Sequence, residues 1–116
     1  MFLQNNSYLK RLYNQYNKKY FDGRLPNILV GYVTTRQLKQ ARVKKGTCAF
    51  TSFDPKFTTI PVAIGIHFNR SKSMTYIKAD MLHEMAHVAN PRANHGPVFQ
   101  KEMKRIAQAG AFIDVW

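Results

Sequence analysis

The stretch His83-Glu84-Met85-Ala86-His87 decides how the rest of the chain is interpreted, and it falls within a segment of helical periodicity. Apolar residues recur at helical spacing between Ser73 and Pro91. These residues are Ile77, Met81, Leu82, Met85 and Val88. Residues four positions apart lie one above the other on a helix, so His83 and His87 can offer ring nitrogens to one metal ion. The stretch therefore predicts a helix that carries two metal ligands.

Glu84 gives this pair of histidines the pattern of a zinc hydrolase. A catalytic zinc usually has three protein ligands and a water molecule, and the metal lowers the pKa of that water towards neutrality. Glu84 follows the first ligand and is placed to act as the general base that takes the proton of this water. The same residues could serve packing and solvation alone, but the chain has only four histidines, which makes a chance match uncommon. The sequence predicts one catalytic zinc ion.

The third ligand must come from outside the motif. Downstream of the motif, the side chains suited to zinc are those of His95, Glu102 and Asp114. Asn90-Pro91 ends the motif helix and lets the chain turn back, whereas Glu102 falls inside a last helix expected at about residues 97–110. His95 is therefore the favoured ligand, Glu102 is its main rival, and Asp114 lies close to the end of the sequence.

The remaining pattern predicts an α+β fold with a single domain over residues 1–116. Helical periodicity favours a first helix at about residues 6–20, with Ser7 as a candidate cap. Runs with strand character follow at residues 28–33, 46–53 and 60–69. The expected architecture is zincin-like, with an N-terminal helix, a three-stranded sheet, the motif helix and a C-terminal helix.

The third strand carries His67, the one histidine that the zinc site does not use. Apolar residues alternate along this strand, which places His67 on the face opposite the apolar row. We expect His67 to be structural or exposed, and the functional alternative is a contact with a substrate carbonyl. A strand near His67 or Cys48 is also a candidate for binding an extended peptide by strand addition, if that strand lies at the edge of the sheet.

The chain is strongly basic, with 18 Lys and Arg against six Asp and Glu and a net charge of +12. Such a charge attracts polyanions, and DNA bound without sequence preference is the favoured partner. Acidic proteins and anionic membranes are the alternatives, but no basic amphipathic helix with a free apolar face suits lipid. Residues 34–45 are expected to form a basic surface loop, which is either a DNA contact or a plain solvated connection. The cations of this loop are Arg36, Lys39, Arg42, Lys44 and Lys45.

The aromatic residues of the first helix do not decide the question of DNA binding. Four tyrosines sit there at helical spacing: Tyr8, Tyr13, Tyr16 and Tyr20. We expect them to pack in the core and at its rim rather than to stack on bases.

Several segments of the sequence resemble the SprT-like metalloproteases, a family with members that cleave proteins crosslinked to DNA. These segments are Tyr16-Asn17, Phe21-Asp22-Gly23-Arg24-Leu25-Pro26, Gly46-Thr47-Cys48, the motif itself and His95-Gly96-Pro97-Val98-Phe99. The resemblance implies that His95 is the third zinc ligand, that Glu84 activates water, and that the substrate is a DNA-bound protein. The cysteine-based zinc ribbon of bacterial members has no counterpart, because Cys48 is the only cysteine.

The sequence thus predicts a zinc metalloendopeptidase that holds one zinc ion with His83, His87 and His95. The alternative is a nucleic-acid-binding module in which the zinc is structural or serves another hydrolysis. The apolar stretches are too short to span a membrane, the start has no leader character, and a lone Cys48 suits a reducing compartment. We therefore expect a cytoplasmic monomer whose partners are DNA and a protein substrate.

Overall fold

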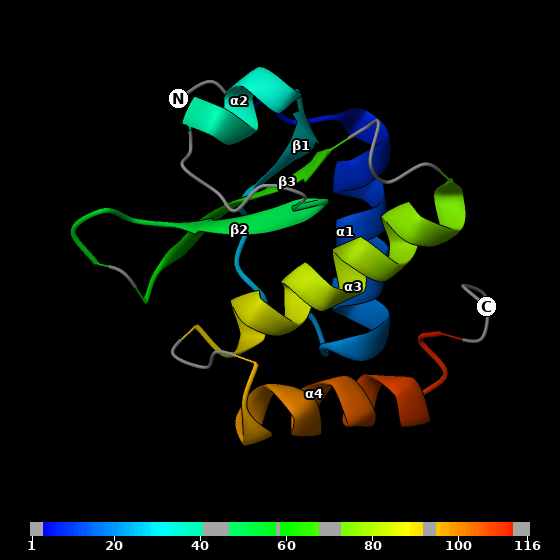
Figure 1. The fold of residues 1–116 in the computed structure, drawn as a ribbon. Coiled ribbons are helices and arrows are strands. Elements are labelled where there is room, and N and C mark those ends of the chain that lie inside the picture. Colours follow the sequence, from blue (N-terminus) through cyan, green and yellow to red (C-terminus); the bar gives the residue numbers. More distant parts are fainter. Residues whose placement is uncertain (1–3, 41–46, 58, 68–72, 92–94, 113–116) are drawn as a thin grey trace.

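A computed structural model describes residues 4–40, 47–57, 59–67, 73–91 and 95–112. The fold is α+β, with four helices and one small sheet (Figure 1). The elements in chain order are α1 (Ser7–Tyr20), β1 (Leu29–Val33), α2 (Thr35–Gln40), β2 (Ala49–Phe53), β3 (Pro61–His67), α3 (Met74–Ala89) and α4 (Pro97–Gln108). Figure 1 shows α2 and α4 at opposite ends of the molecule, with α1 and α3 between them. Within the described residues, no helix combines the length and the apolar character needed to cross a bilayer.

The sheet has the strand order β1-β3-β2, so the last strand in the sequence lies in the middle. β3 pairs with β1 in parallel and with β2 antiparallel, and Ile64 of β3 lies between Val30 of β1 and Thr51 of β2. The three strands that the sequence predicts are confirmed, although each is shorter than expected. The strand order shows which strands lie at the edges of the sheet. These are β1 and β2, because β3 is paired on both sides.

Both faces of β3 are covered, so His67, on the face opposite the apolar row, is buried, which fits the structural rather than the exposed alternative. Ile64 and Ile66 belong to the main core between the sheet, α1 and α3. On the other face, Ala63 packs in a second cluster with Leu38 of α2. His67 is buried there, with its Nε2 atom 2.9 Å from the Thr35 hydroxyl. In a central strand with both faces covered, successive side chains are all buried. Alternation of residue types along such a strand therefore does not identify a solvent-exposed face.

The prediction of a basic loop at residues 34–45 is wrong for its first half, where the chain forms the helix α2. The Thr34 side chain caps this helix by accepting a hydrogen bond of 3.1 Å from the Gln37 amide. Leu38 then anchors the helix in the second cluster, where it is almost fully buried. Arg36 and Lys39 are exposed on α2. The other cations assigned to this loop, Arg42, Lys44 and Lys45, lie outside the described residues.

The loop after α1 is held to the helix by polar side chains of α1 itself. The amide of Asn17 donates to the Leu25 carbonyl oxygen and accepts from the Leu25 N–H, at 3.1 and 3.0 Å. The Tyr13 hydroxyl donates to the Pro26 carbonyl oxygen at 2.6 Å. Between these anchors the chain turns through Asp22 and Gly23, which both have positive φ angles. At the other end of α1 the cap is Asn6 rather than the expected Ser7, since its side chain accepts from the Leu9 amide.

Candidate metal centre

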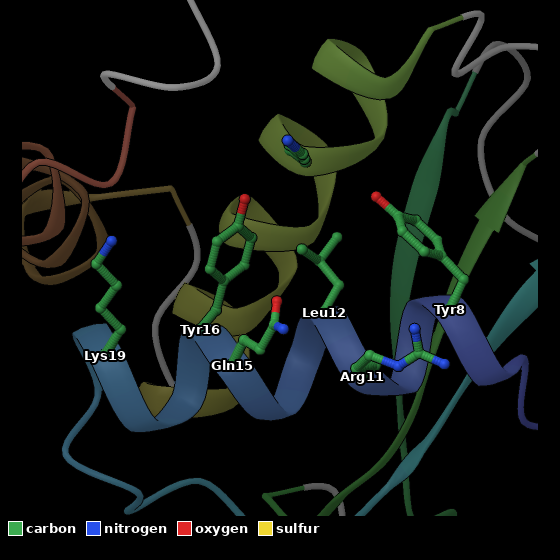
Figure 2. A pocket seen from close by; sticks show the side chains of 7 residues that line it. Tyr8, Arg11, Leu12, Gln15, Tyr16 and Lys19 are labelled. Atoms are coloured by element: carbon green, nitrogen blue, oxygen red, sulfur yellow. The ribbon is translucent and has the colours of Figure 1, made fainter.

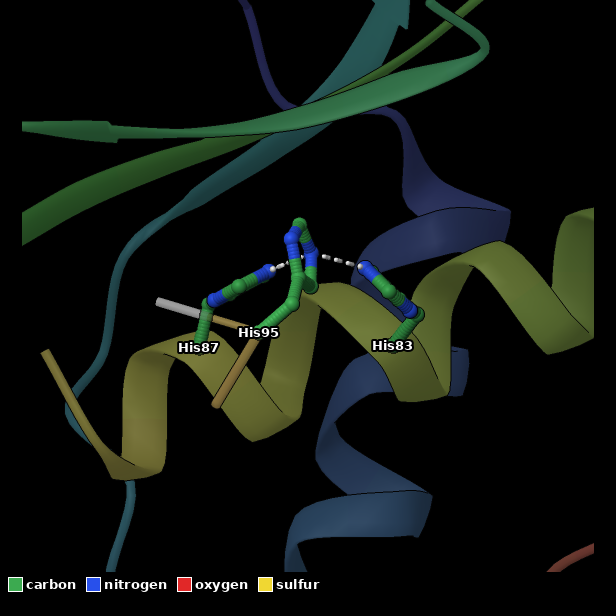
Figure 3. Close-up of side chains that lie close together, drawn as sticks. All are labelled: His83, His87 and His95. Atoms are coloured by element: carbon green, nitrogen blue, oxygen red, sulfur yellow. Dashed lines mark hydrogen bonds between the residues drawn. The ribbon is translucent and has the colours of Figure 1, made fainter. Parts of the chain in front are cut away.

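Three imidazole rings converge beside α3 (Figure 3). His83 and His87 lie four residues apart on α3, so both rings project from the same face of the helix. His95 precedes α4 and reaches back towards them, because the chain turns after α3 ends at Ala89. The Nε2 atom of His95 lies 3.2 Å from Nε2 of His83 and 3.1 Å from Nε2 of His87.

These distances fit a zinc ion. Tetrahedral zinc with Zn–N bonds of about 2.0–2.1 Å needs nitrogen atoms that lie about 3.3–3.4 Å apart. The observed separations of 3.1 and 3.2 Å differ from this value by only a few tenths of an ångström. Neutral imidazole is also a preferred ligand type for zinc. The three histidines therefore form a cluster that can hold a metal ion, and its donor set suits zinc.

Phe99 of α4 is in contact with all three imidazoles. Its ring stacks on His87, with the ring centroids 4.4 Å apart and the planes at 25°. Its edge-on contacts with His83 and His95 have centroid distances of 4.9 and 5.0 Å. Phe99 is almost fully buried and touches all three rings, so it limits their orientations. Sequence reasoning placed Phe99 on the apolar face of the last helix and missed this contact, because it joins α4 to residues of another element.

Glu84 lies on α3 between the two histidines, and its carboxylate is buried against β2. The Thr51 hydroxyl of β2 lies 2.8 Å from Oε1 of Glu84 and 3.3 Å from the Glu84 carbonyl oxygen. Glu84 is one of two buried polar or charged residues among those described, and only 6% of it is exposed. The Thr51 hydrogen bond was not predicted, since nothing local in a strand marks a threonine as the partner of a residue 33 positions away.

The burial of Glu84 changes its acidity. Removal from water raises the pKa of the Glu84 carboxyl group to about 7, while the hydrogen bond from Thr51 opposes this shift and the nearby Asp80 adds to it. Burial also lowers the pKa of His83, and the neighbouring His95 acts in the same direction. Without a metal ion, the carboxyl group thus titrates near neutral pH, and His83 favours the neutral form that ligates metals.

A cavity of about 370 Å³ opens beside Glu84 and His83. It lies between β2, α3 and α4, and Phe112, which follows α4, also borders it. Its other lining residues are Cys48, Ala49, Ala79, Asp80, Met103 and Phe112. The carboxyl group of Glu84 and the His83 imidazole therefore border a space that can admit a substrate group, which is the usual form of a reactive site.

The rival ligands are placed elsewhere or are not described. Glu102 forms an ion pair with Arg105 on α4, with 2.5 Å between the Arg105 Nη2 and Glu102 Oε1 atoms. Within the described part of the chain, the cluster of possible metal ligands contains only the three histidines. Asp114 lies outside the described residues. Of the basic residues proposed for DNA, the exposed Arg36 and Lys39 do not line the cavity beside Glu84.

Comparison with known proteins gives one match. The model of the SprT-like family matches residues 9–115, which includes almost every described element and all of the candidate metal centre. No curated protein and no solved structure matches the chain significantly.

Proposed function

The chain belongs to the SprT-like family, and from this premise we propose that it is a zinc-dependent metallopeptidase of zincin-like fold that cleaves proteins bound or crosslinked to DNA. The observation that carries the proposal is the convergence of three imidazole nitrogens beside a buried glutamate. A structural zinc site is usually closed by four protein ligands, whereas a catalytic site keeps one position open. A cluster of three histidines, as found among the described residues, supports the catalytic type.

His83, His87 and His95 would hold the zinc ion. Bound zinc supplies a Lewis acid that polarises a carbonyl oxygen and lowers the pKa of water. The stacked ring of Phe99 keeps the imidazoles in the orientation that ligation needs. Residues that contact metal ligands usually orient them in this way. The three ligands come from two segments, so the metal would also tie the start of α4 to α3.

Glu84 performs the proton transfers in this proposal. Its carboxylate accepts a proton from the attacking water and later delivers it to the leaving amine of the cleaved peptide bond. The Thr51 hydroxyl holds Oε1 of Glu84 at 2.8 Å, which limits the rotation of the carboxylate between these two steps. A pKa raised by burial makes Glu84 a stronger base than an exposed carboxylate, although a nearby cation lowers it again.

The sheet order supports β2 as the strand that receives the peptide. An extended substrate adds to a sheet through the free edge of an outer strand. β2 is an outer strand, and it contributes both Thr51 and the cavity residue Ala49. The segment around His67 is excluded from this role, because β3 is central and paired on both sides.

The DNA part of the proposal is supported by the charge of the chain. A net charge of +12 on 116 residues attracts polyanions and favours binding without sequence preference. This net charge already includes all six acidic residues, so the chain as a whole carries a positive field that its own acids do not offset.

The test is replacement of Glu84 by Gln in the zinc-loaded protein. We expect zinc content and thermal stability of the loaded protein to be retained, and cleavage of a DNA-binding protein in the presence of single-stranded DNA to fall by about 10²–10⁴-fold. Cleavage products are quantified by mass spectrometry, which also shows whether peptide bonds are cut. Unchanged cleavage would refute the role of Glu84. A wild-type protein that binds zinc and DNA but cuts no protein would instead be a binding module.

A further inference from the structure

A second cavity runs along α1, away from the metal centre. Its volume is about 530 Å³, and it lies between α1 and the first half of α3, with Lys78 as the contribution from α3. Figure 2 shows Tyr8, Tyr16 and Lys19 of α1 projecting towards the same side as Leu12, while the Arg11 side chain lies along the helix. We call this cavity, lined by Tyr8, Arg11, Tyr16, Lys19 and Lys78, the α1 groove. No residue of the candidate metal centre lines it.

The charge of the α1 groove is entirely positive. Arg11 and Lys19 are exposed and lie eight residues apart, which corresponds to about 12 Å along a helix. Lys78 faces them from α3. The sequence of α1 contains no acidic residue, and none of the described acidic residues lines the groove. Three cations without a neighbouring acid attract the phosphates of a polyanion.

Two aromatic rings, those of Tyr8 and Tyr16, line the α1 groove together with these cations. Tyr8 and Tyr16 are half-buried and pack against the main core, whereas Tyr13 and Tyr20 are buried within it. Tyr16 is further held by the Tyr20 ring, whose centroid is 5.7 Å away. The expectation of core and rim packing thus describes the tyrosines correctly, but the two at the rim also border the groove. Each presents a fixed ring beside a cation, and such rings are platforms on which bases stack.

We propose that the α1 groove binds single-stranded nucleic acid. The phosphates would lie at Arg11, Lys19 and Lys78, and unpaired bases would stack on Tyr8 and Tyr16. From Tyr8 to Lys19 the groove extends about 17 Å along the helix, which is about five steps at the 3.4 Å rise of a stacked strand. Base stacking on a side chain needs unpaired bases, so this groove favours a single strand over a duplex. The inference deepens the proposed function by naming where its DNA binds, and the binding itself does not depend on cleavage.

The position of the groove separates DNA binding from catalysis. Lys78 and His87 lie nine residues apart on α3, which is about two and a half helical turns, so their side chains leave opposite sides of the helix. A strand bound in the α1 groove therefore leaves the cavity beside Glu84 open to a polypeptide. DNA and a protein attached to it can be held at the same time by two sides of one helix.

The first test uses the zinc-loaded full chain and a fluorescent oligothymidine of about 15 nucleotides, a length that covers the groove. The triple variant Arg11→Gln, Lys19→Gln, Lys78→Gln should bind at least about tenfold more weakly, and the dependence of log K on log salt should become shallower by about 2. The matched control is Lys56→Gln, Lys101→Gln, Lys104→Gln, which removes the same charge at exposed sites outside the groove. An equal loss of affinity in both variants would overturn the proposal, because binding would then follow net charge alone.

A second test addresses the rings. Tyr16→Leu should weaken binding about fivefold or more, whereas Tyr16→Phe keeps the flat ring and should bind like the wild type. Circular dichroism melting of each variant checks that the fold is retained. If Tyr16→Leu binds as tightly as the wild type, or if a duplex of equal length binds as tightly as the single strand, the stacking role is wrong.

Cleavage of an unstructured peptide without DNA separates this inference from the proposed function. The groove variant should cut such a peptide at the wild-type rate, because none of its three residues borders the metal centre. If neither the wild type nor the groove variant cuts any peptide, the proposed peptidase activity is wrong. The binding measurements still test whether the α1 groove binds single-stranded nucleic acid. Loss of peptide cleavage in a folded groove variant would contradict the separation of the two sites.

Discussion

The Thr51 hydroxyl lies 2.8 Å from Oε1 of Glu84 and joins the edge strand β2 to the helix that carries the candidate metal ligands. Glu84 is buried at this point, so its carboxyl group depends on Thr51 for a hydrogen bond that water supplies at an exposed site. The position of the proposed base is therefore set by the sheet as well as by its own helix.

Replacing Thr51 by Val should lower kcat by about tenfold to a hundredfold without loss of zinc, because the shape is kept and the hydroxyl is lost. The hydrogen bond from Thr51 lowers the pKa of Glu84 in the wild type, so the acidic limb of the pH–rate profile should move to higher pH in the variant. The Thr51→Ser variant retains the hydroxyl and serves as the control. An unshifted profile in Thr51→Val would show that this contact does not tune Glu84.

Replacing Phe99 by Leu should reduce the affinity for zinc by about tenfold, since Leu fills the space but cannot stack on His87. Competition with a chromophoric chelator measures the affinity. Val98, the preceding residue on α4, is 59% exposed, and Val98→Ala should leave the affinity unchanged. Equal affinities of all three proteins would mean that the imidazoles keep their orientation without the ring.

The identity of the third ligand is tested by comparing His95→Ala with Glu102→Gln. His95→Ala removes one of the three converging nitrogens and should abolish stoichiometric zinc content by elemental analysis. Glu102→Gln breaks the ion pair with the partly exposed Arg105, which costs less than about 1 kcal/mol, and should retain one zinc ion. Loss of zinc from Glu102→Gln together with retention in His95→Ala would reverse the assignment.

The stability of the metal-free protein should depend on pH through Glu84. Its pKa is about 7 in the folded state, above its ordinary value of 4.5, so the folded chain binds this proton more tightly than the unfolded chain. The contribution of Glu84 to the free energy of unfolding therefore falls as the pH rises from about 4.5 to about 7, by up to about 3 kcal/mol. His83 acts in the opposite direction, because its lowered pKa makes protonation below about pH 6.5 unfavourable for the fold.

The Glu84→Gln variant isolates this contribution, since Gln stays neutral and His83 is present in both proteins. Without metal, the variant should melt at a higher temperature than the wild type at about pH 8 and at a similar temperature at about pH 4. A melting difference that is the same at both pH values would contradict the raised pKa.

The long elements of the fold were accessible from the sequence because their apolar periodicity is local. The helix α2 was not, since it has only six residues and cations dominate its segment. So short a helix forms through tertiary packing, here of Leu38, rather than through its own propensity. The choice between a structural and an exposed His67 stayed open for a related reason, because no local sequence pattern reveals the strand order that places β3 in the centre.

The histidines of the candidate site were also accessible, because helical spacing and donor chemistry point to them directly. Thr51 and Phe99 were not, since their contacts with Glu84 and His87 join different elements. The segments near the N-terminus that resemble the SprT-like family carry no chemistry of their own in the sequence. Their contacts now explain two of them physically: Asn17 holds Leu25 in place, and the positive φ of Gly23 forms the turn between these residues.

α4 buries only Phe99 and Ile106 fully, and the Arg105 guanidinium donates to the Tyr20 carbonyl oxygen as a further link to α1. With so few anchors, α4 has a low cost of local opening. His95 lies just before this helix. If His95 binds a metal ion, local opening of α4 must also break the bond between the metal and His95. A metal ion bound by the three histidines would therefore resist the opening of α4, and the metal-free protein would be more exposed to proteolysis at this helix.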